Sequence, residues 1–253
     1  MRTLVIVPTF NEAPNILHTL DEISMYLPSS DVLVVDDGSP DGTGALVAGR
    51  ALDDPRVSLL EREQKNGLGA AYRAGFDYAR AHGYEVVIEM DADGSHPAER
   101  LPALVEALAA ADVAVGSRWI HGGSVAGWAL HRRALSRTAS SYVRLMLGIP
   151  VHDATSGFRA FRAEALEVID ASSTTSNGYC FQIETLHRAE RCGLTVTEVP
   201  IAFAERAHGH SKMTGGIIAE ALTRVIRWRR HPYSPSTPAT APAAVAPAPV
   251  AAV

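Results

Sequence analysis

The sequence predicts an α/β fold, a single domain with a mostly parallel central sheet flanked by helices. Short apolar runs rich in β-branched residues alternate with stretches of helical periodicity through the first half of the chain. Most of these runs are continuously apolar, which is typical of strands that are buried on both faces. Acidic or polar turns follow several of the runs, as expected where a sheet edge carries a binding site.

The elements of the first half are expected in a regular order. The expected strands are residues 3–7, 32–35, 57–60, 86–90 and 113–115, and the expected helices are residues 12–27, 41–52, 69–82 and 98–110. In the first helix, Ile16, Leu20, Ile23 and Leu27 recur at helical spacing and form one apolar face.

The pattern changes after Arg118. The expected elements are a glycine-rich loop at 122–127, a long amphipathic helix at 128–147, mixed loop and helix at 153–169, a helix at 182–193, a strand at 195–203 and a basic amphipathic helix at 213–230. From Pro232 the composition collapses to mainly Pro, Ala, Ser, Thr and Val, which cannot bury enough apolar surface to fold. We therefore expect one domain over residues 1–231 and a disordered tail over 232–253.

Composition narrows the function classes. The chain of 253 residues is 47% hydrophobic and 20% charged, an ordinary globular balance, and its net charge of −5 argues against a nucleic-acid binder. Its two cysteines, Cys180 and Cys192, form neither a disulfide framework nor a zinc pattern. Because no signal peptide or membrane-spanning run is visible, we expect a soluble or peripheral protein that faces the cytoplasm.

Asp91 and Asp93 give the strongest local signal for chemistry. They lie one residue apart in Met-Asp-Ala-Asp-Gly-Ser, just past the expected strand 86–90. In a turn they can converge on one hard cation, and Mg²⁺ or Mn²⁺ is commonly held by one or two carboxylates plus substrate phosphates. A solvated turn is the alternative, but acidic turns at neighbouring strand ends favour a site.

Two other expected strands also end in polar turns. Val35-Asp36-Asp37-Gly38-Ser39 follows the second strand, and Pro8-Thr9-Phe10-Asn11-Glu12 ends the first. Part of the turn after the second strand is explained if Asp41 caps the next helix. Part of the turn after the first strand is explained if Pro8 ends the strand and Asn11 or Glu12 begins the helix. Carboxylates at such an edge also accept hydrogen bonds from a base or ribose, so the three turns together outline a nucleotide site.

These motifs resemble those of the family-2 glycosyltransferases of GT-A fold. The matching segments are residues 7–12, 34–43, 65–69 and 90–93, in the family's order. Within that family, three more segments resemble the corresponding segments of dolichol-phosphate (polyprenol-phosphate) mannose synthases: residues 116–118, 153–159 and 206–212. The resemblance spans about residues 3–230. It implies a nucleotide-sugar half at 1–118 and an acceptor and lid half at 119–231 with interfacial helices.

The resemblance also implies roles for individual residues. The residues implied to bind the nucleotide sugar are Pro8, Phe10, Glu12, Val35, Asp37, Asp91, Ala92, Asp93, Arg206 and Lys212. Asp91, Asp93 and Ser95 would form the site for Mg²⁺ or Mn²⁺. The family often has Gln at the position of Ser95. Arg206 and Lys212 would close over the diphosphate from a flexible loop. Asp93, Arg118 and Arg132 would be the catalytic residues.

The acceptor site is expected in the second half. By resemblance, Arg118, Arg132 and Ser136 would bind the phosphate of a lipid. The alternative is that these residues form a solvated basic face without a ligand. Two helices combine apolar residues with arginine and tryptophan, which favours contact with a membrane surface over core packing alone. Asp153 and Gln182 could touch the sugar, although Asp153 could equally hold Arg159 or cap a turn.

The expected reaction transfers mannose from GDP-mannose to a polyprenyl phosphate, with inversion, at the cytoplasmic face of the membrane. A separate membrane-anchoring protein could be a partner. Two alternatives stay open: a related transferase that uses UDP-glucose or another donor, and a non-catalytic nucleotide-sugar-binding subunit of a membrane complex. A Rossmann oxidoreductase is disfavoured because no Gly-x-Gly-x-x-Gly follows the first strand.

Overall fold

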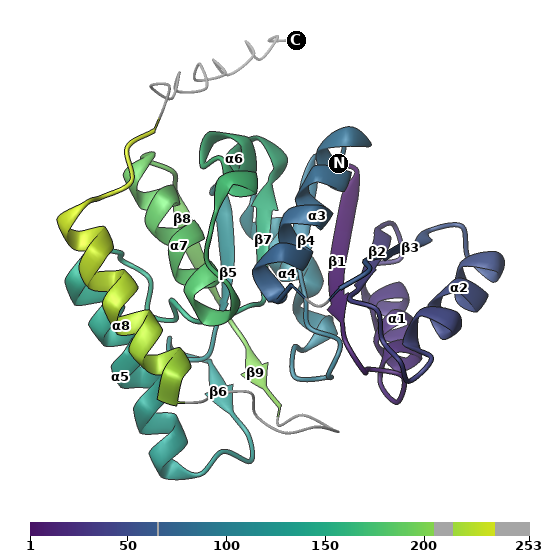
Figure 1. Ribbon diagram of the computed structural model, residues 1–253, viewed down its shortest axis with the longest axis horizontal. Helices are drawn as coiled ribbons and strands as arrows, with labels where there is room; N and C mark the ends of the chain where they lie inside the picture. Colours follow the sequence, from purple (N-terminus) through teal and green to yellow (C-terminus); the bar gives the residue numbers. More distant parts are fainter. Residues whose placement is uncertain (65, 205–214, 236–253) are drawn as a thin grey trace, which may run out of the picture.

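The protein has an α/β architecture with helices on both faces of one large sheet (Figure 1). The computed structural model describes residues 1–64, 66–204 and 215–235. The seven strands of the large sheet run in the order β3-β2-β1-β4-β7-β5-β8. They are β1 (Thr3–Thr9), β2 (Asp31–Asp36), β3 (Val57–Glu61), β4 (Val86–Glu89), β5 (Val113–Ser117), β7 (Arg159–Arg162) and β8 (Val196–Pro200).

The expected fold class is confirmed, because every neighbouring pair in this sheet is parallel except the two pairs that β7 makes. β7 is antiparallel to both β4 and β5 and lies between them. A small second sheet pairs β6 (Ser124–Val125) with β9 (Ala202–Phe203). The single strand expected at 195–203 is therefore wrong in detail, because its last residues leave the large sheet and join β6.

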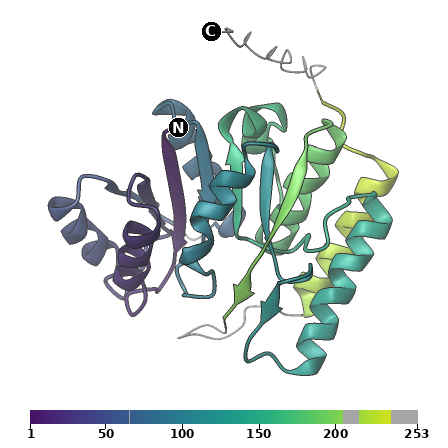
Figure 2. The same ribbon diagram turned by 180° about the vertical axis from the view of Figure 1, so that it is seen from behind.

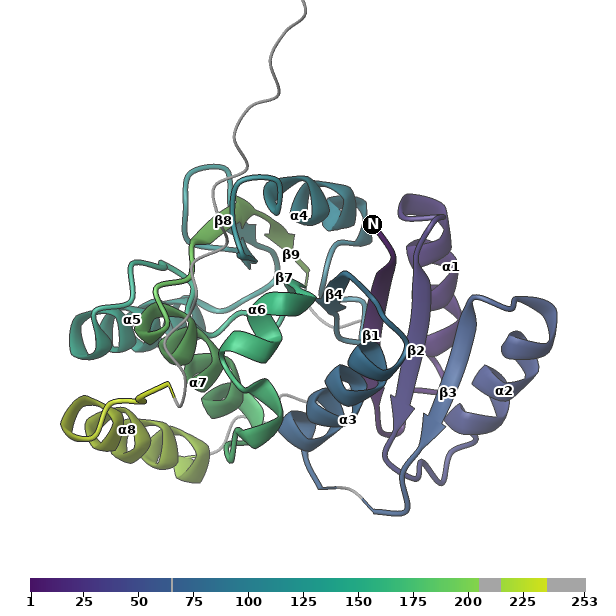
Figure 3. The same cartoon turned by 90° about the horizontal axis from the view of Figure 1, so that it is seen from above.

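Helices cover the two faces of the large sheet separately (Figures 2 and 3). They are α1 (Ile16–Tyr26), α2 (Thr43–Asp53), α3 (Leu68–Ala81), α4 (Leu101–Ala107), α5 (Leu130–Leu147), α6 (Ala163–Val168), α7 (Gly178–Arg191) and α8 (Gly215–Arg230), with short 3-10 turns at Ala98–Arg100 and Ala171–Ser173. Helices α3, α6 and α7 lie on one face, whereas α1, α2 and α4 lie on the other.

The alternation of side chains along β1 explains why two cores form. Leu4 and Ile6 pack into the core under α3 and α7, and Val5 and Val7 pack into the core under α1 and α4. Gly75 allows α3 to approach β1 closely, since a β-carbon there would lie 2.7 Å from the Ile6 side chain. Burial on both faces accounts for the continuously apolar strands in the sequence.

Helices α5 and α8 pack side by side at the end of the sheet beyond β5 and β8 (Figure 1). Within the part of the chain that the structure describes, no helix is long and apolar enough to cross a membrane. Arg206, Lys212 and residues 236–253 of the expected tail lie outside the described residues.

Candidate active site

The carboxyl ends of β1, β2 and β4 meet at one edge of the sheet, because these strands are parallel and adjacent (Figure 1). A cavity of about 360 Å³ opens at this edge. Seven predicted donor-site residues line it: Pro8, Phe10, Glu12, Asp37, Asp91, Ala92 and Asp93. Val35 does not line the cavity, because its side chain is completely buried in the core under α3. The sequence prediction therefore brought together residues that are up to 85 positions apart.

Asp91 and Asp93 occupy a turn that is fixed from inside the protein. The main-chain N–H of Asp91 donates to Nδ1 of buried His96 (2.9 Å), whose ring stacks on Phe158 with centroids 5.1 Å apart. The main-chain N–H of Ser95 donates to Oδ1 of Asp93 (3.1 Å). Both carboxylates border the same cavity, so the donor set fits a Mg²⁺ or Mn²⁺ ion whose other ligands are substrate phosphate oxygens and water.

Ser95 lies deeper than the two aspartates. Its side chain is fully buried, its hydroxyl lacks a hydrogen-bond partner in the described part of the chain, and it does not line the cavity. No group of three or more His, Cys, Asp or Glu residues poised for a metal occurs among the described residues. Of the three predicted metal-site residues, Asp91 and Asp93 border the cavity and Ser95 does not.

The two acids of the second turn have different environments. The buried Asp36 carboxylate accepts hydrogen bonds from the Thr9 hydroxyl (2.7 Å) and from the main chain and hydroxyl of Ser39 (2.8 and 2.6 Å). The bond from Thr9 links the end of β1 to the end of β2. Asp37 borders the cavity and accepts a 2.7 Å hydrogen bond from Arg62, a contact that the sequence did not indicate.

Buried polar side chains underlie the cavity. Burial raises the pKa of Glu89 to about 8, although Arg159 opposes this, and burial lowers the pKa of Arg159 to about 10. Arg159 donates to the main-chain oxygen of Gln182 (2.7 Å) and to the Thr185 hydroxyl (3.0 Å). Gln182 lines the cavity and is 1% exposed; its amide lies near Glu89, but neither amide atom has a partner in hydrogen-bonding geometry among the described residues.

Arg118 directly follows β5 and is held by Asp153. Its Nε and Nη2 donate to the two Asp153 oxygens, each over 2.6 Å, and its main-chain N–H donates to Oδ2 (3.0 Å). Arg118 Nη2 also donates to the Thr155 hydroxyl (3.0 Å). Both charged side chains are buried. The suggested pairing of Asp153 with Arg159 is therefore replaced by a bidentate pair with Arg118.

A second cavity, of about 310 Å³, lies among α5, α7 and α8. It contains the three predicted acceptor-phosphate residues, Arg118, Arg132 and Ser136, and the Arg132 guanidinium carbon lies 4.0 Å from the Trp128 ring centroid. The rest of its lining is mainly apolar, with Leu135, Tyr142, Val143, Ile183, Leu222 and Val225. We call this cavity the apolar groove.

The apolar groove adjoins the cavity at Asp91 and Asp93. Thr155 and Tyr179 line both, and Thr155 is the hydroxyl that Arg118 contacts. Sequence reasoning missed these two residues, together with Gly157 and Asn177 of the first cavity. None of them follows a predicted strand. Thr155 and Gly157 lie in the segment 153–159, whose resemblance to the mannose synthases was the one sequence feature that pointed to any of the four.

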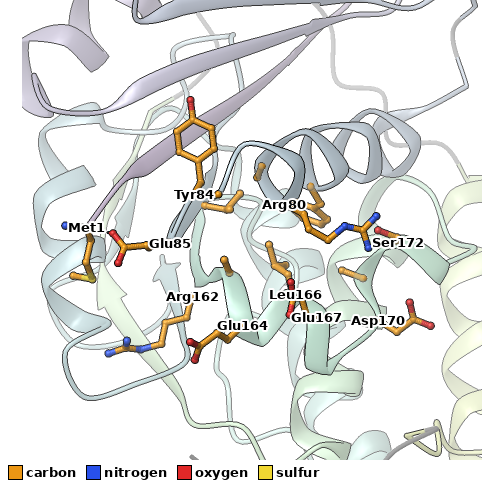
Figure 4. A pocket seen from close by; sticks show the side chains of 16 residues that line it. Met1, Arg80, Tyr84, Glu85, Arg162, Glu164, Leu166, Glu167, Asp170 and Ser172 are labelled. Carbon is orange, nitrogen blue, oxygen red and sulfur yellow. Dashed lines mark ion pairs between the residues drawn. The ribbon is translucent and has the colours of Figure 1, made fainter.

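Another cavity, of about 530 Å³, lies elsewhere (Figure 4). It opens at the amino ends of β1 and β4, between α3 and α6, and none of the predicted site residues lines it. Charges of both signs border it, including Arg80, Arg162, Glu164 and Glu167 (Figure 4). In open α/β sheets ligands bind at the carboxyl ends of the strands, so the cavity at Asp91 and Asp93 is the candidate active site.

Comparison with known proteins shows the family of the chain. Residues 4–170 match the family model described as glycosyl transferase family 2. The chain belongs to this family and is a glycosyltransferase. It is 52% identical to the polyprenol monophosphomannose synthase of Mycolicibacterium smegmatis, over 90% of this chain and 86% of that protein. It is 49% identical to the undecaprenyl-phosphate mannosyltransferase of Micrococcus luteus, over 90% of this chain and 94% of that protein.

Solved structures support the GT-A fold. The structure of a mannosyltransferase from Pyrobaculum calidifontis, in complex with GDP-Man and Mn²⁺, is similar with a TM-score of 0.63 and 22% identity. The alignment covers 92% of this chain and 65% of that one. Mannosyl-3-phosphoglycerate synthase from Rubrobacter xylanophilus has a TM-score of 0.66 and 17% identity, over 91% of this chain and 75% of that one.

Proposed function

We propose that this glycosyltransferase moves mannose from GDP-mannose to a polyprenyl phosphate, with inversion at the anomeric carbon and with Mg²⁺ or Mn²⁺ as cofactor. The adjacency of the two cavities carries the proposal. A cavity with four carboxylates (Glu12, Asp37, Asp91 and Asp93) and an apolar groove with two arginines share Thr155 and Tyr179 as a common wall. The names of the two sequence relatives favour mannose as the sugar and a polyprenyl phosphate as the acceptor.

The first cavity is the proposed donor site. Pro8, Phe10, Glu12 and Asp37 would contact the base and ribose, and Asp91 and Asp93 would hold the metal beside the diphosphate. A bound divalent cation would offset the negative charge that grows on the departing GDP. Arg206 and Lys212, outside the described residues, are proposed to add positive charge there. Ser95 is proposed to hold a water molecule of the metal site.

The apolar groove is the proposed acceptor site. Arg118, Arg132 and Ser136 would bind the lipid phosphate, and the isoprenyl chain would lie along the apolar side chains of α5 and α8. Asp153 orients Arg118 through the bidentate pair, so its guanidinium is fixed before the substrate binds. The Trp128 indole N–H is buried and has no acceptor among the described residues. A phosphate oxygen would supply one.

The chemistry needs little proton transfer. The attacking phosphate oxygen is already anionic at neutral pH, so positioning and charge stabilisation can carry the step. The oxygen forms a bond to the anomeric carbon as the bond to the GDP oxygen breaks, and this single displacement inverts that carbon. Arg118 and Arg132 would reduce the repulsion between the two anionic substrates.

We propose further that the enzyme binds peripherally at the cytoplasmic face of the membrane. Leu130 and Leu145 of α5 are 81% and 80% exposed, and Leu222 and Ile226 of α8 are also exposed. Arginines flank them on both helices. Exposed leucines next to arginines are typical of interfacial helices. A separate membrane-anchoring protein is a possible partner within this proposal.

A transfer assay tests the function. The purified chain would be incubated with radiolabelled GDP-mannose, Mn²⁺ or Mg²⁺ and a polyprenyl phosphate, and the lipid would then be extracted. We expect metal-dependent label in the lipid phase and much less from UDP-glucose. Preferred transfer from UDP-glucose would support the related transferase instead. Binding of GDP-mannose without any labelled lipid would contradict catalysis by this chain and support a non-catalytic subunit.

A further inference from the structure

A third cavity borders Arg118, and the proposed reaction does not use it. Its volume is about 280 Å³, and it is lined by the loop after β5 and by one flank of α5. The side chains that matter are Trp119, His121, Arg133 and Arg137. We call this cavity the basic pocket.

The charge of the basic pocket is uncompensated. Arg118 is neutralised by Asp153, but no carboxylate lines the pocket, and neither Arg133 nor Arg137 forms an ion pair within the described part of the chain. The two are exposed and one helical turn apart, so their guanidinium groups lie on the same flank of α5. Two such groups at this spacing match the oxygen atoms of a phosphate.

Trp119 gives the basic pocket a fixed wall. Its ring centroid lies 5.6 Å from the Arg137 guanidinium carbon and 5.5 Å from that of Arg118. Its indole N–H is buried and has no acceptor among the residues that the structure describes. An anion in the basic pocket would therefore meet two guanidinium groups beside an indole ring.

The position of the basic pocket on α5 indicates where the anion comes from. Leu130, one turn before Arg133 on the same helix, is 81% exposed, and Leu145 is 80% exposed. Leucines that face outward beside arginines suit a helix whose apolar residues enter a bilayer while its charges meet head groups. A binding site for a soluble anion would leave the exposure of these leucines unexplained.

We propose that the basic pocket binds the head-group phosphate of an anionic membrane lipid, distinct from the acceptor. This inference rests on the proposed function, which already places α5 at the membrane. Because Arg118 lines both the basic pocket and the apolar groove, the bound head group would hold α5 against the bilayer next to the entrance for the acceptor lipid.

Vesicle binding of the full chain tests the proposal. Sedimentation would compare phosphatidylcholine vesicles with vesicles that contain about 30% phosphatidylglycerol. We expect R133Q/R137Q to weaken binding to the anionic vesicles by roughly 10- to 30-fold, since two phosphate contacts are lost. The matched control is R2Q/R80Q, which removes two exposed charges that lie on neither α5 nor α8 and do not line the basic pocket. It should weaken binding less than about threefold.

Equal losses in the two double variants would overturn the proposal, because diffuse attraction would then explain the binding. A second arm titrates inorganic phosphate without vesicles and follows tryptophan fluorescence. Saturation that R133Q/R137Q abolishes, with vesicle binding unchanged, would assign the basic pocket to a soluble phosphate and overturn the lipid assignment. A short-chain acceptor in detergent separates this result from the proposed function. Both double variants should transfer mannose at the wild-type rate, and an inactive wild type would contradict the function alone.

Discussion

Arg118 and Asp153 form a buried bidentate ion pair, with both N–O distances at 2.6 Å. The two residues come from the end of β5 and from the loop before β7, 35 positions apart. Arg118 also donates a 3.0 Å hydrogen bond to Thr155, which lines both the apolar groove and the proposed donor cavity, the cavity at Asp91 and Asp93.

Replacing Asp153 by Asn should destabilise the protein. The substitution leaves the Arg118 charge buried without a counter-charge, and breaking a buried pair typically costs about 3–5 kcal/mol. Urea denaturation would measure the free energy of unfolding. The control is Arg80→Gln, which breaks an exposed pair with Asp77 and should cost less than about 1 kcal/mol. Similar losses in both variants would argue against a structural role for the Arg118–Asp153 pair.

Replacing Asp93 by Asn should remove metal-dependent catalysis without unfolding the chain. The carboxylate borders the donor cavity, and the amide lacks the charge that a hard cation requires. We expect the transfer rate to fall by roughly 100-fold or more. Calorimetry with GDP-mannose present should show weaker Mn²⁺ binding. Asp53→Asn, at an exposed carboxylate of α2, is the control and should leave both readouts unchanged.

Replacing Gln182 by Leu should weaken donor use but not the fold. The amide is buried and unpaired in the described chain, so an apolar replacement removes a polar group that is costly to bury. Loss of a hydrogen bond to a donor hydroxyl should raise the donor KM by about tenfold. The unfolding free energy should stay level or rise. Destabilisation with an unchanged donor KM would instead make Gln182 a purely structural residue.

His187 should make the stability of the protein depend on pH. Burial lowers the pKa of His187 to about 4, from 6.5. Between these values the unfolded chain binds the proton and the folded chain does not, so stability is lost as pH falls from 6.5 to 4. His187→Gln should flatten this slope in urea unfolding curves. His18→Gln, at an exposed side chain, should leave the slope as in the wild type, and a slope that neither variant alters would refute the assignment.

The donor cavity could be predicted because it follows from local sequence patterns. Parallel strands bring their carboxyl ends to one edge, so turns that follow β1, β2 and β4 must lie near one another. Asp91 and Asp93 could therefore be assigned to one site with Phe10 and Asp37 before any distance was known. Such patterns do not show which residues at a strand end face the cavity, and the side chain of Val35, the second-last residue of β2, is buried in the core under α3.

The rest of the site depends on contacts between distant segments. β7 was missed because its four residues, Arg-Ala-Phe-Arg, lack a β-branched run and carry a charge at each end. The buried Arg159 side chain finds two of its acceptors on the distant α7 and one at the main-chain oxygen of Ala154. Likewise, nothing in the segment 153–159 specifies that Asp153 faces Arg118 rather than Arg159. Thr155 and Tyr179 join the two cavities only after β7 and α7 have packed.

The claim that donor and acceptor occupy two adjoining cavities is tested most directly by Arg132→Gln. Arg132 lines the apolar groove and not the donor cavity. Steady-state rates would be measured while GDP-mannose and polyprenyl phosphate are varied in turn. We predict that the KM for polyprenyl phosphate rises by about tenfold or more, while the KM for GDP-mannose stays within about twofold. A rise in the KM for GDP-mannose with no change in that for polyprenyl phosphate would contradict the assignment.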